Sequence, residues 1–452
     1  MNSKITFCGG AGTVTGANFL LDTGTQKVLI DCGSHAQDHA CDIKNFEAFP
    51  YDPASIQVLL VTHSHADHIG RIPKLVKDGF RGVIYSTEPT KDIASVMFDD
   101  ALSIMQSQAE HEGCDILYEK GDIEQALDLW KTAPYHEPFA LGDMQCEFFD
   151  AGHVLGSALI KLTRNGRVIF FSGDLGNSPE PLLNDTEHPE GAHYILMESV
   201  YGDRLHEARG ERTERLKEEI EATRKDNGTL LIPSFSIERT QVLLFEINDM
   251  VEKKEIAPIA IYVDAPLATR ITQRFRMYAN FLNPDARDHF AKGDDPFAFP
   301  GLTVVGSTEE SRGIHTKPSP KVIIAGAGMS AGGRIRSHEK YYLGDKHAAV
   351  LFVGYQAVGS LGRRIQDGAE KVQIDGEWIR VHARMSTLTG YSGHADRDQL
   401  MQFVENAGDQ LEHVFVAMGE PKSSIFLAQR IKDFFGIEAS APETGDTKEI
   451  NF

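Results

Sequence analysis

The sequence predicts an α/β protein with two domains. A chain of 452 residues is too long for one simple hydrophobic core, and its hydrophobic content of 41% is ordinary for a globular protein. Short apolar runs typical of buried strands alternate with helix-like stretches. Polar residues that can bind metal or carry protons directly follow several of these runs, at the strand ends where α/β sheets place their chemistry.

The first 200 residues contain most of the predicted strands. These apolar runs occupy residues 5–8, 18–21, 27–30, 58–61, 82–86, 146–149, 167–171 and 194–197. Residues 91–130 carry apolar side chains at helix-like spacing, so this segment is predicted to be helical. The first half is therefore expected to be rich in sheet.

The strand at 58–61 leads directly into a dense set of metal-ligand side chains. Within six residues the chain places His63, His65, Asp67 and His68. His63 and His65 are two apart, so an extended chain presents both on one side, where they can bind one ion together. Asp67 and His68 lie at the predicted bend into a helix and point elsewhere, toward a second ion. Imidazole with carboxylate suits zinc first and manganese next.

Other predicted strands also end in polar residues. Asp31 lies beside a glycine, where it can orient metal ligands through a hydrogen bond or simply form a turn. His153 lies among glycines, in a position from which a third imidazole can reach the first ion. Asp174 and Glu198 each follow a buried strand in the same way.

After about residue 204 the pattern becomes a regular alternation of strands and helices. A charged helical segment at 206–227 precedes apolar runs at 228–233, 258–263, 321–325 and 348–353. Helix-like stretches lie between these runs. This alternation predicts a parallel α/β domain.

The charge distribution restricts the partners. A net charge of −21 argues against broad non-specific nucleic-acid binding, which requires a positive surface. Residues 312–346 reverse this balance, and within them the glycine-rich stretch 326–333 precedes Arg334 and Arg336. Backbone N–H groups there can face a phosphate, although a solvated face or a tight strand-to-helix turn would explain the same residues.

The block His63-Ser-His-Ala-Asp-His68 resembles the His-x-His-x-Asp-His signature of the metallo-β-lactamase superfamily. Asp31, this block, His153 and Asp174 match the superfamily's motifs in order. The resemblance implies an αβ/βα four-layer sandwich with a dinuclear zinc site. It implies that His63, His65 and His153 hold one ion, that Asp67 and His68 hold the other, and that Asp174 bridges both.

The second half resembles the β-CASP domain, which marks a nucleic-acid-processing branch of that superfamily. The matching stretches are GTLLIPSFSIERTQ, YVDAPLA, GMSAGGRIRSH and LFVGYQAVGSLGRR. The implied domains are 1–203 and 389–452 for the metallo-β-lactamase fold and 204–388 for an inserted parallel α/β β-CASP domain. The expected substrate contacts are Gly332, Gly333, Arg334, Arg336, His338 and Ser392.

The stretch Thr389-Gly-Tyr-Ser-Gly-His-Ala-Asp396 resembles the β-CASP Ser-x-His-x-Asp motif. The resemblance implies that His394 is the general acid, that Glu198 orients it, and that Asp67 completes the catalytic set. An imidazolium ion can donate a proton to a leaving oxygen, and a carboxylate partner keeps it charged.

The final family motif is altered. Met418 stands where a histidine is expected to complete the second metal site. His413 is no substitute, because it lies about 16 Å away along an extended strand and faces the other side. Thioether sulfur is a poor zinc ligand. Two zinc ions per chain are expected, with the second site weaker or occupied by manganese.

The resemblance to compact bacterial and archaeal β-CASP ribonucleases, and to the pre-mRNA 3′-end endonuclease subunit, implies a metal-dependent ribonuclease. Single-stranded RNA is the expected substrate, cut internally through a zinc-activated hydroxide. A 5′→3′ exonuclease, an RNA-binding scaffold impaired at Met418 and a hydrolase of another substrate remain alternatives. Related proteins often dimerise, which makes a homodimer an open expectation.

The remaining features predict where the protein works. No apolar span approaches the 18 residues of a transmembrane helix, and the N-terminus lacks the apolar core of a signal peptide. The five scattered cysteines form no Cys-x-x-Cys pair and predict reduced thiols. These observations predict a cytoplasmic protein without membrane contact.

Overall fold

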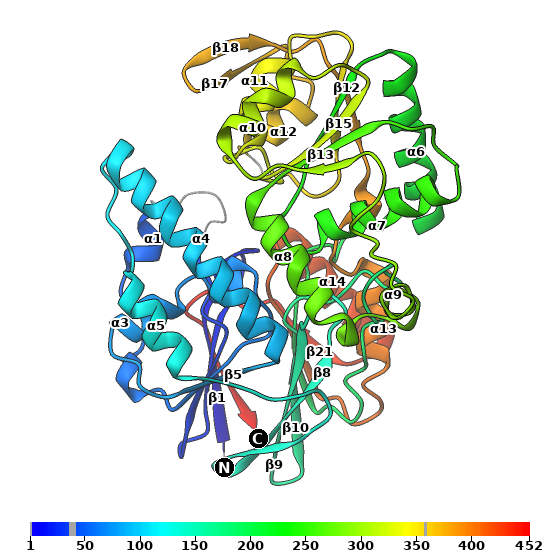
Figure 1. Ribbon diagram of the computed structural model, residues 1–452. Helices are drawn as coiled ribbons and strands as arrows, with labels where there is room; N and C mark the ends of the chain where they lie inside the picture. Colours follow the sequence, from blue (N-terminus) through cyan, green and yellow to red (C-terminus); the bar gives the residue numbers. More distant parts are fainter. Residues whose placement is uncertain (1, 36–41, 357–358) are drawn as a thin grey trace. The chain divides into compact units, whose positions relative to one another are not determined.

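The computed structural model describes residues 2–35, 42–356 and 359–452, and the chain forms two compact units (Figure 1). The first unit comprises Met1–Leu205 and His394–Phe452, and the second comprises His206–Gly393. Cys41 and residues 357–358 of the LFVGYQAVGSLGRR stretch lie outside the described residues.

The first unit contains two seven-stranded sheets. The first sheet has the order β22-β1-β2-β3-β4-β5-β6, antiparallel from β22 to β3 and parallel from β3 to β6. Its strands are β1 Asn2–Gly9, β2 Asn18–Asp22, β3 Lys27–Ile30, β4 Val58–Leu60, β5 Val83–Ser86, β6 Trp130–Thr132 and β22 Thr447–Asn451. The parallel strands bring several strand ends to one edge, where the candidate site forms.

The second sheet has the order β21-β20-β11-β10-β9-β8-β7. Its strands are β7 Phe139–Leu141, β8 Met144–Asp150, β9 Ala158–Arg164, β10 Arg167–Phe171, β11 Tyr194–Met197, β20 His413–Val416 and β21 Glu438–Ser440. Strands β10, β11, β20 and β21 pair in parallel. Strand β8 alternates buried and more exposed residues, as expected when one face of a strand meets the core.

Three hydrophobic clusters show how these layers pack. One joins both sheets face to face, with Phe7 and Phe19 against Phe148 and Phe171. A second covers the other face of the first sheet with helices, and a third does the same for the second sheet. The helices are α1 Ile43–Phe46, α2 Ala66–Ile69, α3 Ile72–Lys77, α4 Glu88–Glu112, α5 Lys120–Asp128, α13 Arg397–Glu405 and α14 Pro421–Phe435. The predicted αβ/βα four-layer sandwich is confirmed.

The second unit is the predicted parallel α/β domain. Its sheet has the order β14-β13-β15-β12-β16-β19, with every neighbouring pair parallel. The strands are β12 Thr229–Pro233, β13 Ala260–Asp264, β14 Leu302–Val304, β15 Lys321–Ala325, β16 Ala348–Phe352 and β19 Arg384–Thr387. The helices are α6 Arg209–Lys225, α7 Arg239–Glu252, α8 Pro266–Met277, α9 Pro284–Ala291, α10 Thr308–Gly313, α11 Ile335–Tyr342 and α12 Leu361–Gln366. A separate hairpin pairs β17 Lys371–Ile374 with β18 Glu377–Arg380.

Several local expectations need correction. The helical segment predicted at 91–130 is two helices, α4 and α5, followed by strand β6, because the chain breaks at Gly113 in the left-handed conformation. The strands missed from the sequence include short edge strands such as β7 and the mostly polar β22, and also the central strand β9, whose apolar run Ala158-Leu-Ile is only three residues long before Lys161. Cys8, Cys32 and Cys146 are free and buried, as expected, but Cys114 is disulfide-bonded.

Within the described ranges, no helix combines the length and the apolar character that crossing a bilayer requires.

Candidate metal centre

Four predicted ligands converge in the first unit. His63 and His65 follow β4, His153 follows β8 and Asp174 follows β10. His65 Nδ1 lies 3.1 Å from His63 Nε2 and 3.2 Å from His153 Nε2. Asp174 Oδ2 lies 3.5 Å from the Nε2 atoms of both His63 and His153. The structure thus brings together side chains from three separate strand ends.

These spacings fit one metal ion. Ligand bonds of about 2.0–2.1 Å at tetrahedral angles set nitrogens about 3.3–3.4 Å apart. The four ligand atoms lie within 4.8 Å of one another, and three of the four residues are buried. Burial is the main cause that lowers the pKa of His63, His65 and His153. Neutral imidazoles with free lone pairs are the form that binds zinc.

A second cluster begins at the other oxygen of Asp174. Asp174 Oδ1 lies 3.4 Å from His68 Nε2. His68 Nε2 and Asp67 Oδ1 are buried and have no hydrogen-bond partner among the described residues. Two orphaned ligand atoms beside a carboxylate are what a second cation would satisfy. Asp174 therefore presents one carboxylate oxygen to the His63–His65–His153 group and the other to His68.

Asp31 holds His68 in place, as a residue that orients a ligand should. Its Oδ2 lies 2.7 Å from His68 Nδ1 and accepts a hydrogen bond of 2.8 Å from the Thr62 hydroxyl. Its Oδ1 accepts from the Thr62 backbone N–H at 2.8 Å. This pairing turns His68 Nε2 away from Asp31. Burial lowers the pKa of His68, but Asp174 and Asp31 outweigh burial and hold it well above its usual value.

The backbone around the histidine block is clamped by neighbouring segments. Ala17 N–H donates to the Asp67 carbonyl at 2.9 Å, and Cys32 N–H donates to the His68 carbonyl at 2.8 Å. A Cβ atom at Gly33 would lie 1.5 Å from the Asp67 carbonyl oxygen, so only glycine fits there. The ligand loop is therefore fixed by the preceding loop and not by its own helix alone.

His153 is positioned by a turn that sequence reasoning did not identify. The Ser157 hydroxyl accepts hydrogen bonds from the backbone N–H groups of His153 and Val154, at 3.1 and 3.2 Å. Asp150 accepts from the Gly152 N–H at 2.9 Å, and burial is the main cause that raises the pKa of Asp150 to about 7. The available signal was the run of polar and glycine residues around His153.

His394 and Glu198 form an acid–carboxylate pair beside these ligands. His394 Nδ1 lies 3.2 Å from Glu198 Oε1 and 3.9 Å from Asp174 Oδ2. Glu198 is fully buried and also accepts from the Leu175 N–H at 2.7 Å. Burial lowers the pKa of His394, but the Glu198 and Asp174 carboxylates outweigh burial and raise it to about 9. The raised pKa favours the protonated imidazole, which is the form that can donate a proton.

Met418 lies in the hydrophobic cluster between the two sheets and is 1% exposed. Its backbone has a φ of +46°, and its N–H donates to the Gly10 carbonyl at 2.6 Å. His413 Nε2 lies 2.8 Å from the Ser440 hydroxyl. Neither residue belongs to the groups of converging His, Cys, Asp and Glu ligand atoms found among the described residues.

The residues expected to contact substrate lie in the second unit. Arg334 pairs with Asp264, and its guanidinium also donates to the Gly306 carbonyl at 3.2 Å. Arg336 pairs with Asp375 at 2.8 Å. His338 is fully buried, with Nε2 2.8 Å from Asp264. Each of these three side chains thus has a partner within the protein.

The other expected contacts are backbone positions. Gly332 has open space where a Cβ would stand, whereas a Cβ at Gly333 would lie 2.4 Å from the Gly326 carbonyl oxygen. Ser392 is buried, and its N–H donates to the Thr389 carbonyl at 2.9 Å. Asp264 was missed as the common partner of Arg334 and His338, although its place at the end of β13 gave the same signal as Asp31.

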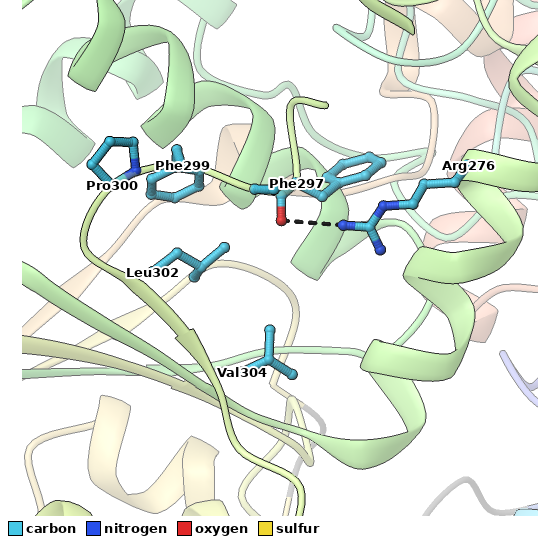
Figure 2. A pocket seen from close by; sticks show the side chains of 7 residues that line it. Arg276, Phe297, Phe299, Pro300, Leu302 and Val304 are labelled. Atoms are coloured by element: carbon cyan, nitrogen blue, oxygen red, sulfur yellow. Dashed lines mark hydrogen bonds between the residues drawn. The ribbon is translucent and has the colours of Figure 1, made fainter. Parts of the chain in front are cut away.

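A cavity of about 450 Å³ also lies in the second unit (Figure 2). Its lining is Arg276, Phe297, Ala298, Phe299, Pro300, Leu302 and Val304. Arg276 donates to the Phe297 carbonyl at 3.3 Å, as the dashed line in Figure 2 shows. The lining contains neither a histidine nor a carboxylate side chain, so it offers no acid–base or metal chemistry.

Fold, ligand geometry and sequence comparisons together define the class. Residues 11–234 match the metallo-beta-lactamase superfamily, residues 240–365 the Beta-Casp domain, and residues 378–442 a Zn-dependent metallo-hydrolase RNA specificity domain. The chain belongs to the β-CASP family of metallo-hydrolases in the metallo-β-lactamase superfamily, as its motifs predicted.

Its relatives include a ribonuclease. The chain is 36% identical to Ribonuclease TTHA0252 of Thermus thermophilus, over 88% of this chain and 89% of the relative. It is 32% identical to Transcription termination factor FttA of Pyrococcus abyssi, over 98% of this chain and 71% of the relative. A crystal structure of a protein of unknown function from Enterococcus faecalis V583 matches at a TM-score of 0.57 and 11% identity over all of both chains, which supports the fold alone.

Proposed function

We propose that this protein is a metal-dependent ribonuclease that hydrolyses phosphodiester bonds of single-stranded RNA. One observation carries the proposal. The His394–Glu198 pair lies directly beside Asp174, which converges with His63, His65 and His153 on one candidate metal site. Phosphodiester hydrolysis needs an activated water molecule and a proton for the departing oxygen. Metal ions would supply the first, and a protonated imidazole beside them would supply the second. The match to an RNA specificity domain and the ribonuclease relative support RNA as the substrate.

The proposed cofactor is two zinc ions. His63, His65 and His153 would hold one, Asp67 and His68 would hold the other, and Asp174 would contact both. When bound, such ions activate a water molecule and neutralise the non-bridging oxygens of a phosphate. Met418 offers no ligand atom suited to zinc, so we expect the second site to be the weaker one and to accept manganese.

His394 is the proposed general acid. Its proton lies on an imidazole that Glu198 and Asp174 keep charged, while the side chain is 23% exposed and so remains reachable. Donation to the departing oxygen would leave a neutral imidazole hydrogen-bonded to Glu198. General acid catalysis of this kind contributes about 10²- to 10⁴-fold in rate.

The proposed mode is internal cleavage of a single strand whose phosphates approach Arg334 and Arg336. Both guanidiniums would first have to exchange a carboxylate partner for a phosphate. Gly332 has room beside it for close approach of a backbone phosphate. No contact of the described residues favours a 5′→3′ exonuclease over an endonuclease.

The test is cleavage of 5′-labelled single-stranded RNA with and without added Zn²⁺ or Mn²⁺. Internal fragments are expected from the wild type and not from Asp67→Ala. The matched control is Asp115→Ala, because Asp115 is an exposed acid of the first unit with no ion pair among the described residues. RNA that stays intact with every metal would reject the proposal.

Met418 supports a second candidate function, an RNA-binding scaffold with an impaired metal centre. Under that candidate, Met418→His should raise the zinc content of the purified protein and switch on cleavage. Unchanged zinc content and unchanged activity in this variant would remove the candidate.

A further inference from the structure

The β17–β18 hairpin of the second unit has one buried face and one exposed face. Val372 and Ile374 point inward and are fully buried. The residues on the opposite side are exposed: Lys371, Gln373, Trp378 and Arg380. In the antiparallel register Lys371 lies opposite Arg380, and Gln373 lies opposite Trp378. The exposed face therefore combines a large aromatic ring with two cations.

Trp378 is 59% exposed, which is unusual for a large indole, whereas the chain's other tryptophan, Trp130, is 2% exposed. Lys371 Nζ lies 4.8 Å from the centre of the Trp378 ring system. In this cation–π contact the ammonium lies over one face of the indole, which leaves the other face for a stacked base.

Repulsion between Lys371 and Arg380 destabilises the hairpin. Like charges directly opposite each other on neighbouring strands are destabilising. Lys371 and Arg380 make no ion pair with any residue that the structure describes, so their charges are not compensated. This is notable in a chain whose net charge is −21. An anion bound between them would relieve the repulsion.

The hairpin is fixed to the domain by its other residues. Arg336 pairs with Asp375 at 2.8 Å and Lys340 with Glu377 at 2.6 Å, which ties the hairpin to α11 (Figure 1). These pairs also neutralise the two acids at the hairpin turn. Val372 and Ile374 are buried in the hydrophobic cluster of the domain, so the hairpin is anchored there while aromatic and positive groups dominate its exposed face.

We propose that this face binds single-stranded RNA, with a base stacked on Trp378 and neighbouring phosphates on Lys371 and Arg380. Stacking on an aromatic ring together with cations along the backbone is how proteins hold unpaired strands without sequence preference. Bases of a duplex are stacked on each other and cannot cover the indole. The proposal rests on the proposed function, since RNA is taken as the substrate, and it adds a contact far outside the ligand cluster in sequence.

A protein partner is the less favoured occupant. The centres of protein–protein interfaces are depleted in lysine, whereas Lys371 here lies directly over the aromatic ring. The adjacent residues 378–442 match an RNA specificity domain, and that match begins at Trp378 itself.

The test uses the tryptophan as its own reporter. Single-stranded oligoadenylate is titrated into the full chain in the Asp67→Ala background, which keeps the RNA intact. We expect quenching of the exposed tryptophan emission, and no such quenching in Trp378→Phe, where only buried Trp130 still emits. Trp378→Ala should weaken binding of labelled RNA about tenfold, while Trp378→Phe should retain most of the affinity because its ring still stacks.

The cations are tested through salt dependence. Each phosphate contact to a single strand contributes about 0.7 to the slope of log affinity against log salt. Lys371→Ala and Arg380→Ala should each lower the slope by about that amount. Lys225→Ala, an exposed lysine of α6 in the same unit, is the matched control and should leave it unchanged.

Three results would overturn the proposal that the exposed face of the hairpin binds RNA. The first is RNA binding that leaves the Trp378 emission and the affinity of Trp378→Ala unchanged. The second is equal quenching by duplex RNA or inorganic polyphosphate. The third is self-association that requires Trp378 without any response to RNA. Cleavage by the wild type without quenching would reject RNA binding at Trp378 but keep the proposed ribonuclease activity. Quenching without cleavage would keep RNA binding at Trp378 but reject the ribonuclease activity.

Discussion

The ligand cluster of the first unit and the glycine-rich loop of the second unit differ in whether their polar side chains have hydrogen-bond partners within the protein. In the cluster, His68 Nε2 and Asp67 Oδ1 are buried without a hydrogen-bond partner. In the loop region, by contrast, the side chains of Arg334 and His338 both bond to Asp264 within the protein. Leaving buried polar atoms unpaired is costly, and it is tolerated where a ligand will satisfy them.

The comparison distinguishes side chains that are already arranged to bind a ligand from side chains whose hydrogen bonds are made within the protein. The candidate ligand atoms of His63, His65, His153 and Asp174 already lie within 4.8 Å of one another, and Asp31 holds His68 beside them. The arginines expected to contact RNA must give up protein partners before they can do so. Substitutions in the two regions should therefore fail differently, one through lost metal and activity, the other through lost stability.

The largest expected effect is that of Asp174→Ala in the ligand cluster. Asp174 presents one oxygen to each set of ligand atoms, so its loss should remove bound zinc and lower cleavage by about a thousandfold or more, or roughly 4 kcal/mol in the barrier. Zinc content by elemental analysis and cleavage rate are measured together. A variant that kept its zinc and its rate would show that the convergence of ligands is not catalytic.

Asp264→Ala should have the next largest effect, on stability rather than chemistry. It would leave Arg334 and buried His338 without their shared carboxylate, and removing one partner of a buried ion pair costs about 3–5 kcal/mol. Thermal unfolding should show a lowered midpoint. Asp375→Ala is the matched control, because it breaks the more exposed pair with Arg336 and should cost only about 0–1 kcal/mol. Equal shifts in both variants would erase the contrast between the two arginines.

Asp31→Asn sharpens the comparison within the cluster itself. Asp31 bonds His68 directly but reaches His63 Nδ1 only through the Thr62 hydroxyl, so the change should weaken the second ion more than the first. Loss of such an orienting partner typically costs about 10- to 100-fold in metal affinity. Titration with a chelator would then release one ion earlier than in the wild type. Simultaneous early release of both ions would mean that Asp31 supports the whole loop.

More of the ligand cluster than of the glycine-rich loop could be predicted from the sequence. The His63–His68 block is local, so spacing alone shows two ligand directions. His153 and Asp174 could be found because they end strands, and the superfamily resemblance put them in one site. The partners of Arg334 could not be found, because Asp264 lies 70 positions earlier and meets it only in the folded sheet. The exposure of Trp378 likewise depends on which side of a short hairpin faces the domain.

The last expected effect is a pH dependence of stability that comes from Glu339, a buried acid on α11 beside the glycine-rich loop. Its Oε1 accepts a hydrogen bond from Ser330 at 2.5 Å, while its Oε2 has no hydrogen-bond partner among the described residues. Burial raises the pKa of this carboxyl from 4.5 to about 8. Between these two values the folded protein holds a proton that the unfolded chain has released, so stability falls as pH rises.

Glu339→Gln should remove that dependence while keeping an acceptor for Ser330. The wild type is expected to lose up to about 1.4 kcal/mol per pH unit from this group between pH 5 and 8, and the variant should lose less over the same range. Thermal midpoints at both ends of the range measure the difference, with exposed Glu309→Gln as the control. Parallel pH profiles for wild type and Glu339→Gln would show that Glu339 is ionised in the folded state, and that the loop, like the metal centre, is built to hold an uncompensated charge.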